Sequence, residues 1–416
     1  MKLSFYDPKP TINDYLSIMY FGELKKYSLM RGIDTEVVED LNIKNSTILL
    51  NGRYLSPDTI IRLKEDDNFI VAFDINDNTF FTDVDDAYGT STAVMHIDLM
   101  FKVAGLQRTL QSYDPFIDDD LNYSRKKVPF RGGNWGSYFD FLDSGRMKSL
   151  PYPPWYPIHV DQVPWEKRNG LTLLRGSHQY QRAHLFFHLL KAGLIDKNTK
   201  FQGEAYVFQY CDDCKMAFKK HGRMTYDYLE SHPDMYCRLK NWKGGSGLPY
   251  RFMGNPEWNN SCLPRYMDMA VMFQEKHGGL DMSMVEDAFN GIFQPIWMNE
   301  ILNRYSFYAD IKWIYSIYEP PRFWEAACAY TINLVPERTR DQDTFPQLLP
   351  DEHYVTYKED FSDLKEVTNI TKEKFCHITN NCYDLYNKWI RPEDYALSTN
   401  LLQHILNEIE GAGGGK

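Results

Sequence analysis

The stretch IYEPPRFWEAACAYTINLVPER, residues 317–338, decides the fold. Two prolines at 320 and 321 stop the chain, and an apolar pattern with a helical period restarts at 322. The pattern predicts a helix over 322–330. A run of Thr, Ile, Leu and Val follows at once and predicts a strand over 331–335. A helix that passes directly into a β-branched strand is typical of α/β domains.

The beginning of the chain alternates in the same way. Short runs rich in Val, Ile and Phe stand on either side of segments with helical periodicity, which favours a parallel sheet with βαβ crossovers. Strands are predicted at 2–6, 35–38, 46–50, 69–73 and 97–103, and a helix at 14–30.

The second half of the chain repeats this α/β alternation. Strands are predicted at 171–174, 205–208, 310–315, 331–335 and 353–357, and helices at 183–192, 322–330, from 360, and at 394–410. Between the two halves, SLPYPPWYPIHVDQVPW at 149–165 carries five prolines. It predicts a semi-rigid connector. We expect domains over 1–150 and 168–392, a connector over 151–167, a last helix over 393–410 and a flexible tail over 411–416.

Composition limits the class of protein. The net charge of −11 argues against a chain that binds polyanions non-specifically. The sequence contains no run of about 18 apolar residues, so no membrane span is predicted. The N-terminus lacks the apolar core of a signal peptide. Seven cysteines without framework spacing indicate a reducing compartment. We therefore predict a cytoplasmic protein, in the host cytoplasm if it is viral.

A metal site is not predicted. Cys211 and Cys214 have the spacing of half a zinc site, but no second CxxC or HxxxH pair follows them. The acidic run at 118–120 is interpreted as a solvated loop. The chemistry is expected to need no metal and no cofactor.

The residues around the two prolines suit a nucleotide sugar. A helix N-terminus offers free N–H groups and partial positive charge, to which Arg322 adds a forked cation. Glu325, one turn into the helix, is placed to accept the hydroxyls of a ribose, and Glu319 to reach a second hydroxylated ring. The alternative is a buried capping glutamate beside a surface arginine.

The segment YEPPRFWEA resembles the donor-binding motif of glycosyltransferases with the GT-B fold, of the group 1 and spore-maturation-like kind. In that family the two glutamates are usually separated by seven residues, and here they are separated by five. LLPDEHYVTYKEDFSDLKEV at 348–367, LTLLRGSHQYQRAHLFFHLLKAGL at 171–194 and VAFDINDN at 71–78 are similar to further stretches of such enzymes.

This resemblance implies two Rossmann-like domains that face each other across a cleft. The first would bind the acceptor and the second the nucleotide sugar. The activity implied is transfer of a hexosyl or pentosyl group to a hydroxyl. The predicted donor-binding residues are Arg175, Ser177, Arg182, Glu319, Arg322 and Glu325.

An inverting enzyme also needs a general base on the acceptor side, whereas a retaining one does not. Asp74 follows a predicted buried strand, and ligands bind beyond the carboxyl ends of such strands. It is the first candidate, and a turn residue at a strand end is the alternative. The further candidates are Asp77, His96 and Asp98.

The sequence leaves the chemical class of the acceptor open. We expect a glycan or another small hydroxylated molecule. A basic strip with an aromatic neighbour also suits double-stranded DNA with a flipped base, so hydroxymethylated bases of bacteriophage DNA are the second possibility. The basic residues of this strip are Arg125, Lys126, Lys127 and Arg131, and the aromatic neighbour is Trp135. A nucleotide-sugar epimerase and a non-enzymatic nucleotide-binding module are the remaining alternatives.

Overall fold

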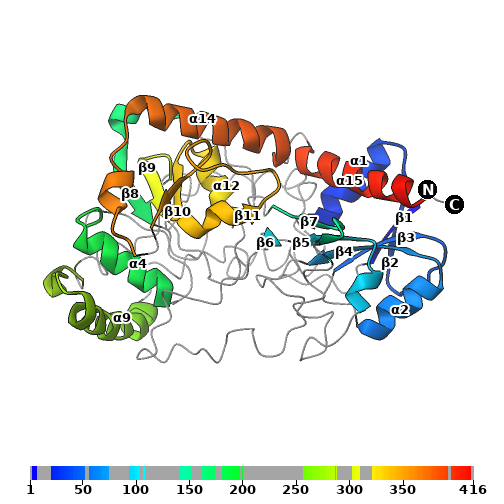
Figure 1. Ribbon diagram of the computed structural model, residues 1–416, viewed down its shortest axis with the longest axis horizontal. Helices are drawn as coiled ribbons and strands as arrows, with labels where there is room; N and C mark the ends of the chain where they lie inside the picture. The colour runs from blue at the N-terminus through cyan, green and yellow to red at the C-terminus, as the bar shows by residue number, and fades with distance from the viewer. Residues whose placement is uncertain are drawn as a thin grey trace.

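The structure is a computed structural model and shows a mixed α/β protein with two parallel sheets (Figure 1). It describes residues 2–6, 20–51, 56–74, 93–102, 106–107, 141, 143–151, 162–173, 180–196, 199, 256–285, 287, 302–309, 321–358, 360–391 and 395–413.

The first sheet has six strands in the order β2-β1-β3-β4-β5-β7, and every neighbouring pair is parallel. Parallel strands in a sheet that helices cover are buried on both faces, which explains continuous apolar runs such as FIVAF at 69–73 in β4. The strands are β1 (Lys2–Tyr6), β2 (Asp34–Val38), β3 (Thr47–Asn51), β4 (Phe69–Asp74), β5 (Leu99–Lys102) and β7 (Met147–Ser149).

Two helices cross over between these strands, and local signals fix their ends. Helix α1 (Gly22–Met30) joins β1 to β2, and Gly32 adopts a positive φ of 74° just after it ends. Helix α2 (Pro57–Glu65) joins β3 to β4. Its N-cap is Ser56, whose hydroxyl accepts a hydrogen bond from the backbone N–H of Thr59 at 3.2 Å. The 3-10 helix η3 (Ala93–His96) precedes β5.

The second sheet has the strand order β12-β10-β9-β8 and is also parallel throughout its described strands. Helix α12 connects β9 to β10, and helix α4 follows β8 and packs against α9. The elements are β8 (Asn169–Leu173), α4 (Tyr180–Lys191), α9 (Pro256–His277), β9 (Tyr305–Ala309), α12 (Pro321–Cys328), β10 (Ile332–Pro336), β12 (Val355–Tyr357) and α13 (Leu364–Val367), with the 3-10 helices η6 (Trp165–Lys167) and η7 (Glu337–Asp341).

Two long helices link the sheets. Helix α14 (Lys372–Trp389) packs against α12 and β10, and helix α15 (Ala396–Gly413) packs against α1 of the first sheet. Figure 1 shows the two sheets at opposite ends of the molecule, with α14 over one and α15 over the other. The short strands β6 (Leu106–Gln107) and β11 (Gln342–Asp343) form an antiparallel pair between the two halves of the chain.

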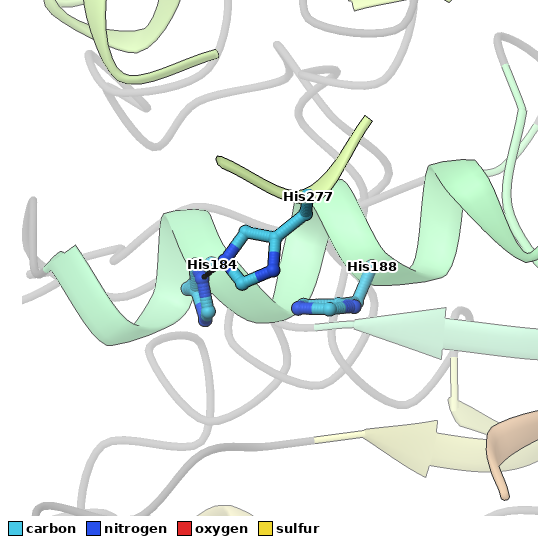
Figure 2. A group of neighbouring side chains, drawn as sticks. All are labelled: His184, His188 and His277. Atoms are coloured by element: carbon cyan, nitrogen blue, oxygen red, sulfur yellow. Dashed lines mark hydrogen bonds between the residues drawn. The ribbon is translucent and has the colours of Figure 1, made fainter. Parts of the chain in front are cut away.

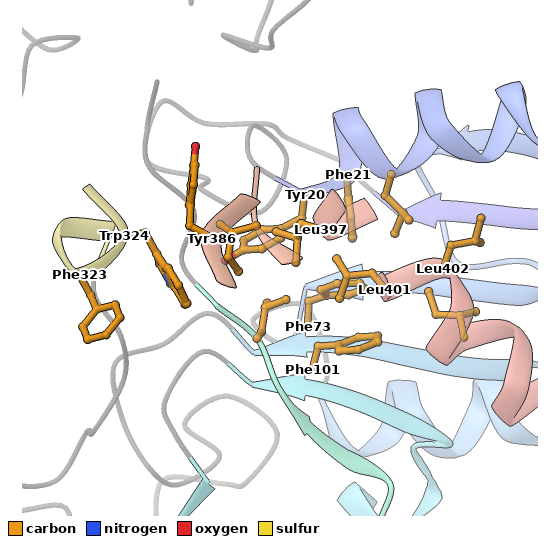
Figure 3. Packing of buried hydrophobic residues seen from close by; sticks show 14 of the residues in the cluster. Tyr20, Phe21, Phe73, Phe101, Phe323, Trp324, Tyr386, Leu397, Leu401 and Leu402 are labelled. Carbon is orange, nitrogen blue, oxygen red and sulfur yellow. The ribbon is translucent and has the colours of Figure 1, made fainter. Parts of the chain in front are cut away.

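One apolar cluster runs from the first sheet through α14 and α15 to α12 (Figure 3). Phe21, just before α1, packs edge-to-face against Phe5 of β1 and Phe73 of β4. At the other end, Phe323 and Trp324 of α12 belong to the same cluster. Because each buried aromatic side chain contributes on the order of 3–5 kcal/mol when compared with alanine, this cluster ties the C-terminal helices to both sheets.

A half-buried arginine, Arg168, joins the amino ends of strands in the second sheet. The Arg168 guanidinium donates to the carbonyl oxygens of Tyr305 at 2.9 Å and of Ala329 at 3.1 Å, and its Nε donates to the Val163 carbonyl at 2.8 Å. Burial lowers the pKa of Arg168 to about 10, which leaves it charged at neutral pH. Arg168 therefore ties together the chain segments at the amino ends of β8, β9 and β10.

The structure confirms most predicted elements, with shifted ends. The predicted strand at 97–103 is the shorter β5, and the predicted helix at 14–30 is described from residue 20, with α1 over Gly22–Met30. Strand β9 lies at 305–309, directly before the predicted 310–315, which lies outside the described residues, as does 205–208. Helices α2 and α14 were not predicted. Within the described residues, no helix is long and apolar enough to cross a membrane.

Candidate functional site

Two helices begin at the carboxyl side of neighbouring strands in the second sheet. Strands β8 and β9 are parallel neighbours, α4 follows β8, and α12 follows β9. Arg182 is the third residue of α4 and Arg322 the second residue of α12. The backbone thus places two of the three predicted donor-binding arginines in the first turn of a helix. Their side chains lie outside the described part of the chain.

Glu325 lies in α12 and is almost completely buried, at 2% exposure. Its neighbours Phe323, Trp324 and Ala326 are buried as well. Only three residues join α12 to β10, so the helix runs back along the sheet, with its first turn toward the carboxyl end. The Asn333 side-chain amide donates to the Phe323 carbonyl at 3.0 Å and holds the helix on β10. A carboxylate in such surroundings is costly to bury, which favours a specific role for it.

In the first sheet, Asp74 ends β4 and Lys102 ends β5 as its register partner. The Lys102 ammonium donates to Asp74 Oδ2 at 2.6 Å, and both side chains are buried. The structure therefore confirms that Asp74 lies at the carboxyl end of a buried strand. It adds Lys102, which the sequence analysis did not single out.

His96 and Asp98 lie at the amino ends of the strands in the same sheet, whereas Asp74 lies at their carboxyl ends. His96 is exposed at the end of η3, and Asp98 comes just before β5 begins. Asp98 accepts hydrogen bonds from Lys64 of α2 at 2.5 and 2.7 Å and from the backbone N–H of Ile70 at 2.8 Å. The length of about four strand residues, which is about 13 Å, separates Asp98 from Asp74 along the sheet. The structure does not bring these two candidates together with Asp74.

Replacing Asp98 by asparagine is expected to lower the free energy of unfolding by about 1 kcal/mol and to leave sugar transfer unchanged, because the partly exposed ion pair with Lys64 is lost far from Asp74. Chemical denaturation and a transfer assay would measure the two effects. A variant that folds normally but loses most of its transfer activity would return Asp98 to the list of candidate bases.

Several predicted site residues lie outside the described residues, so their placement stays a prediction. They are Asp77 of the catalytic set, Arg175, Ser177 and Glu319 of the donor set, Arg125, Lys126, Lys127, Arg131 and Trp135 of the acceptor set, and the cysteine pair Cys211 and Cys214.

Three histidines form a cluster that the sequence analysis missed. His184 and His188 lie one turn apart on α4, and His277 is the last residue of α9 (Figure 2). One ring nitrogen of each lies within 4.8 Å of the others, and the Nε2 atoms of His184 and His277 are 3.3 Å apart. Burial, together with the nearby His277 and Lys191, lowers the pKa of His188 to about 3, so this ring is neutral at neutral pH. The HxxxH spacing in a predicted helix was the available signal.

Comparison with known proteins finds similarity only to solved structures. No family model and no curated protein matches the sequence. An alpha-glucosyltransferase in complex with UDP is 10% identical, with a TM-score of 0.43, and the match covers 96% of this chain and 98% of the other. An alpha-glucosyltransferase in complex with UDP and a 13-mer DNA containing an HMU base is 11% identical, with a TM-score of 0.43 and coverage of 96% and 98%.

The GtfA/B complex is 8% identical, with a TM-score of 0.41, and the match covers 87% of this chain and 57% of the other. At these identities and TM-scores, the function of the chain has to rest on its own residues.

Proposed function

We propose that the protein is a glycosyltransferase of the GT-B type, which moves a sugar from a nucleotide-sugar donor to a hydroxyl acceptor. The observation that carries this proposal is the buried Glu325, one turn into a helix that starts with Arg322. The segment around it resembles the donor-binding motif, and a second helix start with Arg182 follows the neighbouring strand.

In this proposal the diphosphate of the donor binds at the helix starts. The first turns of α4 and α12 supply backbone N–H groups and partial positive charge, and Arg182 and Arg322 supply full charge. Glu325 accepts hydrogen bonds from the ribose hydroxyls. As the bond between sugar and phosphate breaks, negative charge grows on the departing diphosphate, and the same groups stabilise it. The transfer step is proposed to need no metal ion.

The proposed acceptor side is the carboxyl end of the first sheet, with Asp74 as the general base of an inverting reaction. Asp74 would take the proton of the acceptor hydroxyl as this oxygen attacks the anomeric carbon. Lys102 would hold the carboxylate in place. The proposed glycosyltransferase has two domains, over 1–150 and 168–392. The division is supported by the residues of the six-stranded sheet, which all precede 150, and by those of the four-stranded sheet, which all follow 168.

The acceptor is proposed to be a glycan or small hydroxylated molecule, and hydroxymethylated DNA is the second candidate. The basic strip from Arg125 to Arg131 supports DNA, whereas the net charge of −11 supports a small neutral acceptor. Because both acceptor classes suit the sequence, hydroxymethylated DNA belongs in any panel of acceptors beside simple glycosides.

Donor turnover separates these readings from the other classes. The purified protein is incubated with a set of nucleotide sugars, with and without simple glycosides and hydroxymethylated DNA, and release of nucleoside diphosphate is measured. A glycosyltransferase releases it faster when the right acceptor is present. An epimerase converts the donor sugar without release, and a binding module shifts its thermal stability without any turnover.

A further inference from the structure

We infer that His184, His188 and His277 form a zinc-binding site that joins α4 to α9. The side chains come from two helices and point toward one another (Figure 2). This inference goes beyond the proposed transfer reaction, and it departs from the expectation of no metal, which was based on the cysteine pair and on the acidic run at 118–120.

The distance between His184 and His277 fits a shared metal ion. Zinc binds imidazole nitrogen at about 2.0–2.1 Å with tetrahedral geometry, so two ligand nitrogens should be about 3.4 Å apart. The two Nε2 atoms are 3.3 Å apart. The widest separation within the cluster, up to 4.8 Å, has to shorten by roughly 1.5 Å, which rotation of a histidine side chain allows.

The backbone holds the third ligand firmly. His277 ends α9, and the next two residues, Gly278 and Gly279, have positive φ values of 60° and 68° that terminate the helix. The Lys191 ammonium at the end of α4 donates to the His277 carbonyl at 2.9 Å. The ends of the two helices are therefore tied together beside the cluster, as expected for a pre-organised site.

Aromatic rings pack against the cluster. Phe361 stacks on His188 with ring centroids 4.2 Å apart, and Phe273 packs edge-to-face against both His184 and His188. These rings form an apolar wall beside His184 and His188, and one ring nitrogen of each histidine in the cluster lies within 4.8 Å of the others. Three imidazoles suit zinc and leave one tetrahedral position for water or another ligand. Because the ligands come from two helices, the ion would mainly stabilise the fold.

The full-length protein without a histidine tag provides the test. Elemental analysis of the purified protein should find one zinc per chain. After removal of metal with a chelator, addition of zinc alone should raise Tm by roughly 5–10 °C. Addition of cobalt instead should give the visible absorption bands of a tetrahedral site. These measurements use the wild-type chain and do not depend on whether a variant folds.

Matched variants locate the site. His188→Asn and His277→Asn should each abolish the zinc-dependent rise in Tm. His377→Asn should leave it unchanged, because His377 is an exposed histidine that is paired with Glu352 elsewhere in the chain. The double variant Cys211→Ser/Cys214→Ser should also keep the metal. No zinc uptake by the wild-type chain, or uptake that persists in both triad variants, would overturn the inference.

Discussion

Replacing Asp74 by asparagine is expected to lower the rate of sugar transfer by roughly a hundredfold to ten-thousandfold and to leave donor binding unchanged. The substitution keeps the size of the side chain and removes its capacity to accept the proton of the acceptor hydroxyl. Steady-state transfer rates, together with the Kd of the nucleoside diphosphate, measure the two effects.

The buried ion pair with Lys102 requires a control for this experiment. Asp74→Asn leaves the Lys102 ammonium, which is 2.6 Å from the Asp74 carboxylate in the wild type, without its counter-charge. Loss of one partner of such a pair can cost about 3–5 kcal/mol, whereas replacing both partners by neutral groups is often harmless. The double variant Asp74→Asn/Lys102→Met should therefore be more stable than Asp74→Asn.

The double variant separates a catalytic Asp74 from a structural one. If Asp74 is the base, the double variant regains stability and stays inactive. If Asp74 only holds β4 against β5, the double variant regains activity as well, and the assignment fails. Should Asp74→Asn itself transfer sugar at close to the wild-type rate, the anomeric configuration of the product would distinguish a retaining enzyme from one with another base, such as Asp77.

Replacing Arg322 by alanine is expected to weaken binding of the nucleoside diphosphate by about 1.5–3 kcal/mol, which is roughly ten- to more than a hundredfold in Kd. The loss arises because a charge-assisted contact with the diphosphate disappears at the start of α12. Isothermal titration with the diphosphate, and with the free nucleoside as a comparison, measures it. Binding of the nucleoside should change much less.

Arg304 offers a matched control for this prediction. It is an exposed arginine just before β9, at the amino end of the strand that α12 follows. Arg304→Ala removes the same charge from the amino end of β9 and should leave the Kd of the nucleoside diphosphate unchanged. Equal affinity in Arg322→Ala and the wild type would end the assignment of Arg322 to the donor site.

Much of the fold could be predicted from the sequence because local patterns encode it. The buried run of β4 and the helix-to-strand passage from α12 to β10 were visible as apolar periodicity. Helix α14 was also readable, since Phe375, Ile378 and Cys382 repeat on one face, but its many polar residues obscured the pattern. The strand predicted at 310–315 lies outside the described residues and stays a prediction, whereas the described β9 at 305–309 was not predicted.

The candidate sites were less accessible because they depend on contacts between distant residues. Asp74 could be predicted at a strand end, but its partner Lys102 is 28 residues away and is set by the register of β4 against β5. His184 and His188 carry a visible spacing, whereas His277 is 93 residues from His184 and meets it only through packing of α9 on α4.

Transfer of a labelled sugar from a nucleotide sugar to an acceptor, identified by mass spectrometry of the product, tests the central claim most directly. The donor is first selected by thermal shift, and the acceptors are simple glycosides and hydroxymethylated DNA. We expect one donor to give an acceptor that is heavier by one sugar residue, together with release of the nucleoside diphosphate. If nucleotide sugars stabilise the protein but no acceptor gains a sugar and no diphosphate is released, the protein is not a glycosyltransferase for these substrates, and the account of Glu325, Arg322 and Asp74 is contradicted.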